Sequence, residues 1–484
     1  MSRPRALLAL TAALAAAVGV PSAVVPAMSE ETPPPVDASA QGPDTYFPWD
    51  GNGGYDVRHY RIDNSFTPGD GRLRGRTTVQ ATALDDPLRS FSLDLVLTPD
   101  WVKVDGRPAR FAKPRTHELR VTPAVPVGAG ADFTVSVGYH GRPARIHATG
   151  VSPFVWRSGE AMAIGEPQIG AWWFAANETP SDKASYDITI RVPRGQQAIS
   201  NGHLVTRATG RTWTTWRWRQ HKPIVSYLAF FAAGRFEVRR STIDDLATVY
   251  AVSKRLTAGE RDRSFRLLGR TPGIVRWLED WLGPYPYGTS GGVISSLWAG
   301  FALENAGRPT YPYVGGPGYA DNVSLVVHEM AHQWFGNDVS LARWRDIWVN
   351  EGLASYAEWR YAADVWDVPV AEQLRDSYDH HPARSGFWQV RIGAPGAARV
   401  FDEAVYERGA MTMAALQCRI GVTEVDTVLR RWVSERAGGH GSVADFRALA
   451  GEVSGEDLSD FFTAWLDTTA RPEATSDNGF GGCA

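Results

Sequence analysis

The spacing of apolar residues changes near Arg240, and this change constrains the fold more than any other feature of the chain. Before it, short runs alternate apolar and polar residues and are separated by Gly, Pro, Asn and Asp. Successive side chains of a strand point to opposite faces of a sheet, so such alternation is typical of half-buried strands. The runs lie at residues 58–63, 77–83, 91–97, 133–139, 186–192 and 224–231. The first half of the chain is therefore predicted to be an all-β domain, a saddle or sandwich.

Beyond Arg240 the apolar residues recur at the spacing of one face of a helix. The predicted helices lie within residues 256–282, 323–335, 348–365, 409–419, 425–437 and 443–453. We therefore expect a multi-domain α+β protein, with a β domain at 46–240 and a mainly helical domain at 241–473. The segments 28–45, rich in Pro, Ala, Ser and acids, and 474–484, rich in Gly, are predicted to be flexible.

Residues 1–27 have the composition of a secretory signal peptide. Arg3 and Arg5 precede an uncharged run at residues 6–20 that is rich in Ala and Leu, and Val25-Pro26-Ala27 fits the small-residue rule for cleavage. Cleavage is expected after Ala27, which predicts a secreted protein. The alternative is an uncleaved membrane anchor, but the run is shorter than the roughly 20 residues that a membrane-spanning helix needs.

Composition and charge limit the partners that the chain can bind. Hydrophobic residues make up 43% and charged residues 21%, which is ordinary for a soluble globular protein. The formal charge is −3, and it becomes −5 when the leader is removed with Arg3 and Arg5, so neither a nucleic-acid nor a membrane partner is expected. We also expect a monomer. The two cysteines, Cys418 and Cys483, could form one disulfide bond or remain two free thiols.

One pentapeptide has the spacing of a catalytic metal site. His328 and His332 lie four residues apart in a predicted helix, so both imidazoles are on one face, about 6 Å apart. They can bind one Zn²⁺ while Glu329 projects beside it. Glu351, in the next predicted helix, would complete a His₂Glu set with one coordination position left open. The alternative is that these are core histidines and a solvated acid, as each would be if considered alone; their joint spacing favours the metal site.

The helix boundaries around this site are predicted from capping residues. Asp321 or Ser324 is expected to cap the first helix and Gly336 to end it, while Asp346 is expected to cap the second. Asp346 or Glu358 could also orient a zinc ligand by a hydrogen bond.

The strings at 328–338 and 348–354 closely resemble the gluzincin aminopeptidases of the M1 family, and the resemblance extends with interruptions from Gly54 to Trp465. It implies a thermolysin-like catalytic domain with one Zn²⁺ per chain, which removes amino acids from the free N-terminus of peptides. It also implies a short form, without the C-terminal helical domain of larger members.

Three further site residues follow from this resemblance. The string FALEN at 301–305 is similar to the family's Gly-Ala-Met-Glu-Asn signature, so Glu304 would bind the substrate amine, although Phe301 replaces the Gly and Leu303 the Met. Glu166, in a Gly-Glu-Pro string, would offer a second carboxylate, or else be an exposed loop acid. Tyr406, just before a predicted helix, would stabilise the tetrahedral intermediate, or else be a packing residue.

These residues predict a mechanism and leave two rivals. Zinc lowers the pKa of a bound water, Glu329 acts as the general base, and zinc and Tyr406 stabilise the oxyanion. An endopeptidase could use the same metal chemistry, and a catalytically weak zinc-dependent binding module is the rival from another class. The side-chain preference is not predicted, because Trp172, Trp173 and Phe301 could line the pocket or pack in the core.

Overall fold

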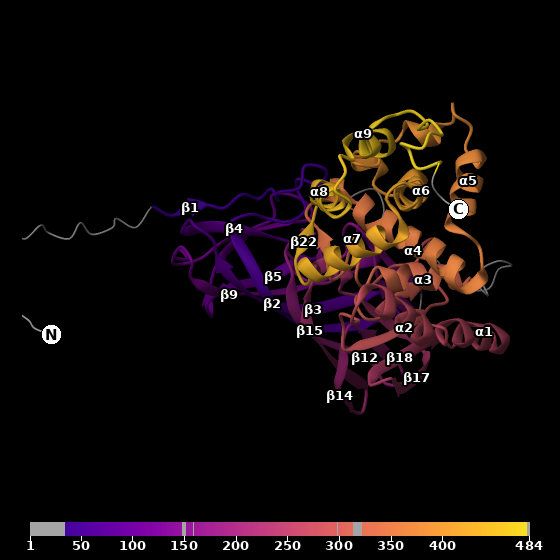
Figure 1. Ribbon diagram of the computed structural model, residues 1–484. Coiled ribbons are helices and arrows are strands. Elements are labelled where there is room, and N and C mark those ends of the chain that lie inside the picture. Colours follow the sequence, from indigo (N-terminus) through magenta and orange to yellow (C-terminus); the bar gives the residue numbers. More distant parts are fainter. Residues whose placement is uncertain (1–33, 148–151, 158, 298, 313–321, 482–484) are drawn as a thin grey trace, which may run out of the picture. The chain divides into compact units, whose positions relative to one another are not determined.

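The computed structural model describes residues 34–147, 152–157, 159–297, 299–312 and 322–481, and the residues from Pro35 onward form one compact unit. Figure 1 shows strands mainly in the indigo to magenta part of the chain and helices mainly in the orange to yellow part. The multi-domain α+β fold class predicted above is therefore confirmed. The predicted signal peptide lies outside the described residues. No helix in the described part of the chain is long and apolar enough to cross a membrane.

The largest sheet has eight strands in the order β14-β15-β12-β2-β3-β9-β5-β6. All neighbours are antiparallel except β12 and β2, which are parallel. Burial alternates along β12, so one face of the sheet packs on the core and the other faces solvent. The strands are β2 Tyr55–Thr67, β3 Arg72–Ala83, β5 Thr98–Val104, β6 Arg107–Pro108, β9 Asp132–Gly141, β12 Ala184–Pro193, β14 His203–Thr209 and β15 Trp213–Ile224.

Two four-stranded sheets complete the strand-rich part. Their orders are β1-β4-β8-β7 and β10-β11-β16-β13. The strands are β1 Val36–Asp37, β4 Leu88–Asp94, β7 Arg110–Ala112, β8 Glu118–Thr122, β10 Phe154–Arg157, β11 Glu160–Ala163, β13 Gln197–Ser200 and β16 Phe231–Gly234.

The strand predicted at 224–231 is wrong. β15 ends at Ile224, a 3₁₀ turn covers Ser226–Leu228, and β16 begins only at Phe231. Every residue of this stretch is buried, so its apolar run did not distinguish a buried loop from a strand. The Asn201 side chain replaces the missing sheet partners, since it donates to the Leu228 carbonyl and accepts from the Phe230 amide.

A further four-stranded sheet, β17-β18-β19-β20, opens the second part of the chain. Its strands are β17 Phe236–Ile243, β18 Leu246–Ser253, β19 Thr289–Ile294 and β20 Thr310–Tyr311. A domain boundary at 240 would cut β17, whereas a boundary before Phe236 keeps the β17–β18 hairpin with the strands that it pairs with. Two short strands, β21 Ser340–Leu341 and β22 His440–Gly441, pair farther along the chain.

The helices lie close to the predicted positions. They are α1 Ala258–Leu268, α2 Thr271–Leu282, α3 Val323–Ala331, α4 Trp348–Trp366, α5 Val370–His380, α6 Glu403–Ile420, α7 Val422–Glu435, α8 Val443–Ser454 and α9 Ser459–Phe462. The predictions missed α5 and α9. α5 buries only Val370, Leu374 and Tyr378, so its apolar face is narrow, and α9 spans a single turn.

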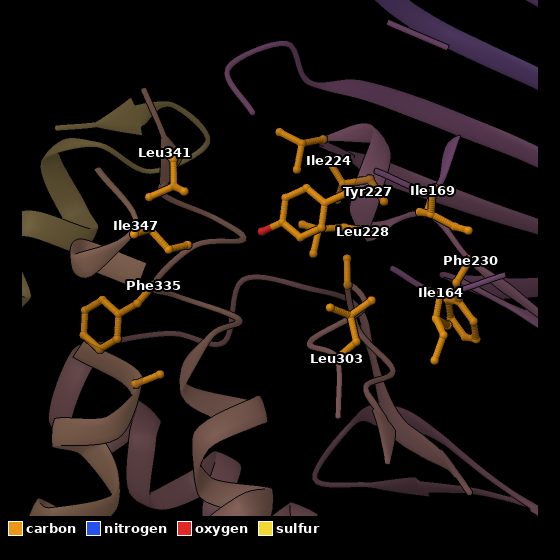
Figure 2. Close-up of a cluster of buried hydrophobic side chains, with 14 of the residues drawn as sticks. Ile164, Ile169, Ile224, Tyr227, Leu228, Phe230, Leu303, Phe335, Leu341 and Ile347 are labelled. Carbon is orange, nitrogen blue, oxygen red and sulfur yellow. The ribbon is translucent and has the colours of Figure 1, made fainter. Parts of the chain in front are cut away.

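A shared core joins the strand-rich and helical parts. Figure 2 shows Phe335, Leu341 and Ile347 on one side of it and Ile164, Ile169 and Phe230 on the other, with Tyr227 and Leu303 between them. All eight side chains are buried. Ile164 and Leu303 lie close in sequence to Glu166 and Glu304, so this core fixes the segments that carry both predicted amine-binding acids.

The predicted flexible ends pack on the protein where the structure describes them. β1 pairs with β4, and the Asp44 carboxylate accepts a hydrogen bond from the Trp344 amide at 2.5 Å. Near the other end, the Phe480 ring lies 4.6 Å from the Tyr378 ring and 6.2 Å from the Trp465 ring. Described residues at both ends thus make specific contacts with the rest of the chain despite a Pro-, Ser- or Gly-rich composition.

Cys418 is disulfide-bonded, so it is not a free thiol. Cys418 is buried in α6, and Cys483 lies outside the described residues.

Candidate metal centre and active site

Two helices bring His328, His332 and Glu351 together. The Nε2 atoms of His328 and His332, in and just after α3, lie 3.2 and 3.3 Å from Oε2 of Glu351 in the first turn of α4. All three side chains are buried, and they are the one group of His, Cys, Asp and Glu in the described residues with the spacing to hold a metal ion. The three residues predicted as ligands therefore converge on one point.

The second ring nitrogens of the histidines are already engaged. His328 Nδ1 is 2.8 Å from Glu358 Oε1, and His332 Nδ1 is 3.1 Å from the Phe335 carbonyl. A neutral imidazole that donates through Nδ1 presents the lone pair of Nε2, which is the atom that faces Glu351 here. Two acids were expected to orient a zinc ligand. Glu358 contacts His328, whereas Asp346 accepts a hydrogen bond from the Val443 amide.

The charge of the group suits a divalent cation. Burial alone would raise the pKa of Glu351, but His332 and His328 outweigh it and lower the pKa to about 2. Although burial lowers the pKa of His332, the Glu351 charge raises it to about 9, so a bound cation would replace protons of this group. A carboxylate oxygen and two imidazole nitrogens are a donor set that Zn²⁺ prefers in catalytic sites.

The local capping predictions were partly wrong. Asn322 caps α3, since its side chain accepts from the Leu325 amide; Ser324 lies inside the helix, and Asp321 lies outside the described residues. α3 ends at Ala331 rather than at Gly336, and Ile347 rather than Asp346 precedes α4. Asn, Asp and Ser all cap helices well, so the sequence did not single out one of them.

A cavity of about 550 Å³ opens beside the metal group. Its polar lining includes the three ligands together with Glu166, Glu304, Glu329, Ser355, Glu358 and Tyr406. Its apolar lining is formed by Phe301, Ala302, Leu303, Leu325 and Phe401. All the site residues proposed from the sequence therefore line one cavity.

Glu329 lies in α3 between the two histidines and is 4% exposed. Burial raises the pKa of its carboxyl to about 8. A cation at the neighbouring site favours the ionised form, which is the form that can accept a proton.

Glu304 and Glu166 place two more carboxyl groups in the cavity. Glu304 is 2% exposed, and its Oε1 accepts a hydrogen bond from the Tyr227 hydroxyl at 3.0 Å. Glu166 Oε1 is buried and has no hydrogen-bond partner among the described residues. Burial and the Glu304 charge raise the pKa of Glu166 well above its usual value. Glu166 is thus a cavity residue and not an exposed loop acid.

Tyr406 lies within α6, one turn after its start, rather than before the helix as predicted. Its ring stacks on the His328 ring, with centroids 6.0 Å apart. Gly352 and Gly409 allow this approach of α6 to α4, because a Cβ at Gly409 would lie 2.7 Å from the Gly352 Cα. Burial and the Glu351 carboxylate raise the pKa of the Tyr406 hydroxyl well above 10, so it stays protonated and can donate.

Sequence reasoning missed Tyr227, whose hydroxyl donates to Glu304, and Phe401, which lines the cavity. Tyr227 sits in the buried loop mistaken for a strand, and Phe401 precedes α6. Phe301 and Phe401 are 43% and 38% exposed, which is unusual for large apolar side chains, whereas Trp172 and Trp173 are fully buried core residues. Of the three aromatic residues considered as pocket walls, only Phe301 lines the cavity.

Leu303 and Glu304 are held in place by backbone pairing. Leu303 exchanges two backbone hydrogen bonds with Thr310, both at 2.8 Å. The Glu304 carbonyl accepts from the side chains of Gln333 and Asn337. The segment is thus extended and paired with Thr310, even though Leu303 stands where the Gly-Ala-Met-Glu-Asn signature has Met.

Several known proteins are similar in sequence to this chain. Residues 271–465 match the peptidase family M1 domain. Aminopeptidase M1-C of Oryza sativa subsp. japonica is 25% identical over 321 residues, and aminopeptidase N of Canis lupus familiaris is 28% identical over 270 residues. The first match covers 62% of this chain and 36% of the relative, and the second covers 50% and 27%. The chain thus spans about a third of the length of these curated relatives.

Among solved structures, the chain is similar to the M1 zinc metallopeptidase of Deinococcus radiodurans, in a mutant bound to a Tyr-Ser-Ala substrate. The two share 25% identity with a TM-score of 0.78, over 89% of this chain and 99% of that one. Another structure of the Deinococcus radiodurans M1 zinc metallopeptidase gives a TM-score of 0.77. The likeness thus extends over the strand-rich part and the helical part, and the buried His-His-Glu group lies within the matched domain. Residues 271–465 are therefore a peptidase family M1 domain, and the chain shares its fold with an M1 zinc metallopeptidase.

Proposed function

We propose that this protein is a zinc-dependent aminopeptidase, which hydrolyses the first peptide bond of peptides with a free N-terminus. The observation that carries the proposal is the pair of buried carboxyl groups, Glu304 and Glu166, in the same cavity as the metal group. With Glu329 and Glu351 they make four of the five acidic side chains that line this cavity, and cations relieve their mutual repulsion. A metal ion supplies one cation, and the α-ammonium group of a peptide supplies another.

The positions of the acids then explain why one bond is cleaved. Glu304 and Glu166 bind the ammonium group and so fix the distance from the peptide's end to the reacting carbonyl. Glu329 accepts the proton of the attacking water and delivers it to the leaving amine. The Tyr406 hydroxyl donates a hydrogen bond to the carbonyl oxygen as it gains charge. Zinc bound by His328, His332 and Glu351 would polarise the carbonyl and acidify water.

Substitution of Glu304 tests the amine anchor. Glu304→Gln is expected to lower kcat/KM for an aminoacyl anilide by about tenfold to a hundredfold, because one charged hydrogen bond to the ammonium group is lost while Glu166 remains. The measurement compares free and N-acetylated substrates, and the wild type should cleave only the free ones. Equal cleavage of both substrates by the wild type would favour the endopeptidase. A zinc-loaded protein with no turnover of any peptide would favour the binding module.

We further propose that the protein is exported, with Zn²⁺ bound once per chain in a monomer. The support for export is the basic, then apolar, then small-residue pattern of residues 1–27. Expression in a secreting bacterial host is expected to give a protein in the medium whose first residue, by intact mass and N-terminal sequencing, is Met28. Recovery of the full-length chain from the membrane fraction would contradict export and favour the anchor.

A further inference from the structure

The open face of the eight-stranded sheet carries a row of side chains that no part of the peptidase mechanism uses. Arg191 on β12 lies opposite Ser65 on β2, and Ser65 lies opposite Arg74 on β3. Arg74 in turn lies opposite His140 on β9. Neighbouring strands are about 4.8 Å apart, so the two arginines lie about 10 Å apart on either side of a small hydroxyl residue.

Two adjoining hollows, of about 640 and 740 Å³, occupy this face. Ser65 and Trp213 line both of them. Seven arginines line one or the other: Arg72, Arg74, Arg142, Arg145, Arg191, Arg211 and Arg217. Asp63 is the single acidic residue in either lining, and Arg76 already contacts it at 2.7 Å. We call this surface the arginine face.

The positive charge of the arginine face is only partly balanced by described residues. Arg72 and Arg142 lie 3.7 and 4.0 Å from Asp70, and His140 lies 2.7 Å from Asp100. Arg74, Arg145, Arg191, Arg211 and Arg217 form no ion pair with any described residue. The whole chain has a formal charge of −3, so this local excess does not follow from composition. Guanidinium groups held near one another repel, and an anion that contacts several of them relieves the repulsion.

Aromatic rings lie among these arginines. The Arg191 guanidinium is 5.4 Å from the centre of the Trp213 ring. On the same face, the Trp101 ring lies against Gly138, where an added Cβ would be 2.3 Å from the indole nitrogen. Gly138 therefore lets Trp101 lie flat on the sheet, and Trp101 is 38% exposed. A flat, exposed indole offers an apolar surface with a polar edge.

We propose that the arginine face binds an anionic polysaccharide, a sugar chain that carries sulfate or carboxylate groups. The arginines pair with the anionic groups, the indoles pack on the apolar faces of sugar rings, and Ser65 hydrogen-bonds to sugar hydroxyls. The row of arginines crosses several strands, so the ligand lies across the sheet and not along one strand.

Other polyanions fit this face less well. The backbone groups of the central strands are already paired, so a peptide cannot add to the sheet here as a further strand. Nucleic acid carries a dense, continuous charge of about one per 1.7 Å in a duplex, and would extend from the arginine face over a chain of net negative charge. A charged polysaccharide carries its anionic groups on separate sugar rings whose faces are apolar, which suits a surface where arginines and indoles alternate.

The test measures binding of the full chain to heparin, which is sulfated, and to polygalacturonate, which is carboxylated, by isothermal titration at low salt. The wild type is expected to bind at least one of them and not the neutral polymer dextran. The double variant R74Q/R191Q is expected to bind about tenfold more weakly, and Trp213→Ala also more weakly. A matched control, R266Q/R270Q, removes two exposed arginines from the α1–α2 region and should change binding by less than about twofold.

Four outcomes would overturn the proposal. They are no binding to either charged polysaccharide, an equal loss in the two double variants, an unchanged affinity of Trp213→Ala, and tighter binding to single-stranded DNA or polyglutamate than to either polysaccharide. Anilide hydrolysis should be unchanged in every variant, since the arginine face shares no residue with the metal-site cavity. The result is therefore independent of the proposed peptidase activity.

Discussion

Glu329→Gln is expected to lower kcat for an aminoacyl anilide by a factor of about 10² to 10⁴. The amide keeps the size of the side chain and its place in α3, but it cannot accept a proton from water. Zinc content should not change, because the three ligand atoms belong to His328, His332 and Glu351. Steady-state kinetics combined with elemental analysis of the purified protein measures both quantities.

A matched control separates this effect from a general loss of a carboxylate. Glu372→Gln makes the same chemical change at an exposed position in the first turn of α5, away from the cavity. It should leave kcat within about twofold of the wild type. A Glu329→Gln enzyme that retained most of its activity with full zinc occupancy would assign proton transfer to another group, and Glu329 would then serve only to balance charge.

Local periodicity explains which parts of the site could be predicted. The helical repeat alone places His328 and His332 on one face, and the structure keeps both Nε2 atoms within 3.3 Å of Glu351. The eight-stranded sheet follows in the same way from alternation along strands such as β12. These features depend on residues close in sequence, so a pattern of a few residues suffices to predict them.

Contacts between distant segments could not be predicted from such patterns. The hydrogen bond from Tyr227 to Glu304 joins residues 77 apart, and the close approach of Gly352 to Gly409 sets where α6 lies. No pattern of neighbouring residues indicates either pair, because the packing of the whole fold determines which residues meet. The resemblance to the M1 family supplied Glu304, Glu166 and Tyr406 in advance, while their surroundings came only from the structure.

The contacts made by the two ends of the chain could not be predicted for a related reason. Composition predicts how much apolar surface a segment can bury on average, and both ends have little. The Phe480 ring nevertheless packs against Tyr378, and the Asp44 carboxylate accepts a hydrogen bond from the Trp344 amide. An average over a segment does not detect one residue of this kind.

Tyr406→Phe is expected to lower kcat by a factor of about 10² to 10³, with a much smaller change in KM. The variant keeps the aromatic ring and its stacking on His328, so the metal group and the α4–α6 packing should stay intact. It removes only the hydroxyl, whose pKa lies well above 10 and which therefore stays a donor throughout the working pH range. A donor that acts on charge formed during the reaction contributes to kcat rather than to binding.

The kinetic pattern then decides the role of this hydroxyl. Tyr361→Phe is a suitable control, because it removes a hydroxyl from a tyrosine of α4 that does not line the cavity. If Tyr406→Phe raised KM and left kcat unchanged, the hydroxyl would bind the substrate before reaction. If neither parameter moved, Tyr406 would be the packing residue that its position beside His328 also allows, and the oxyanion would depend on the metal alone.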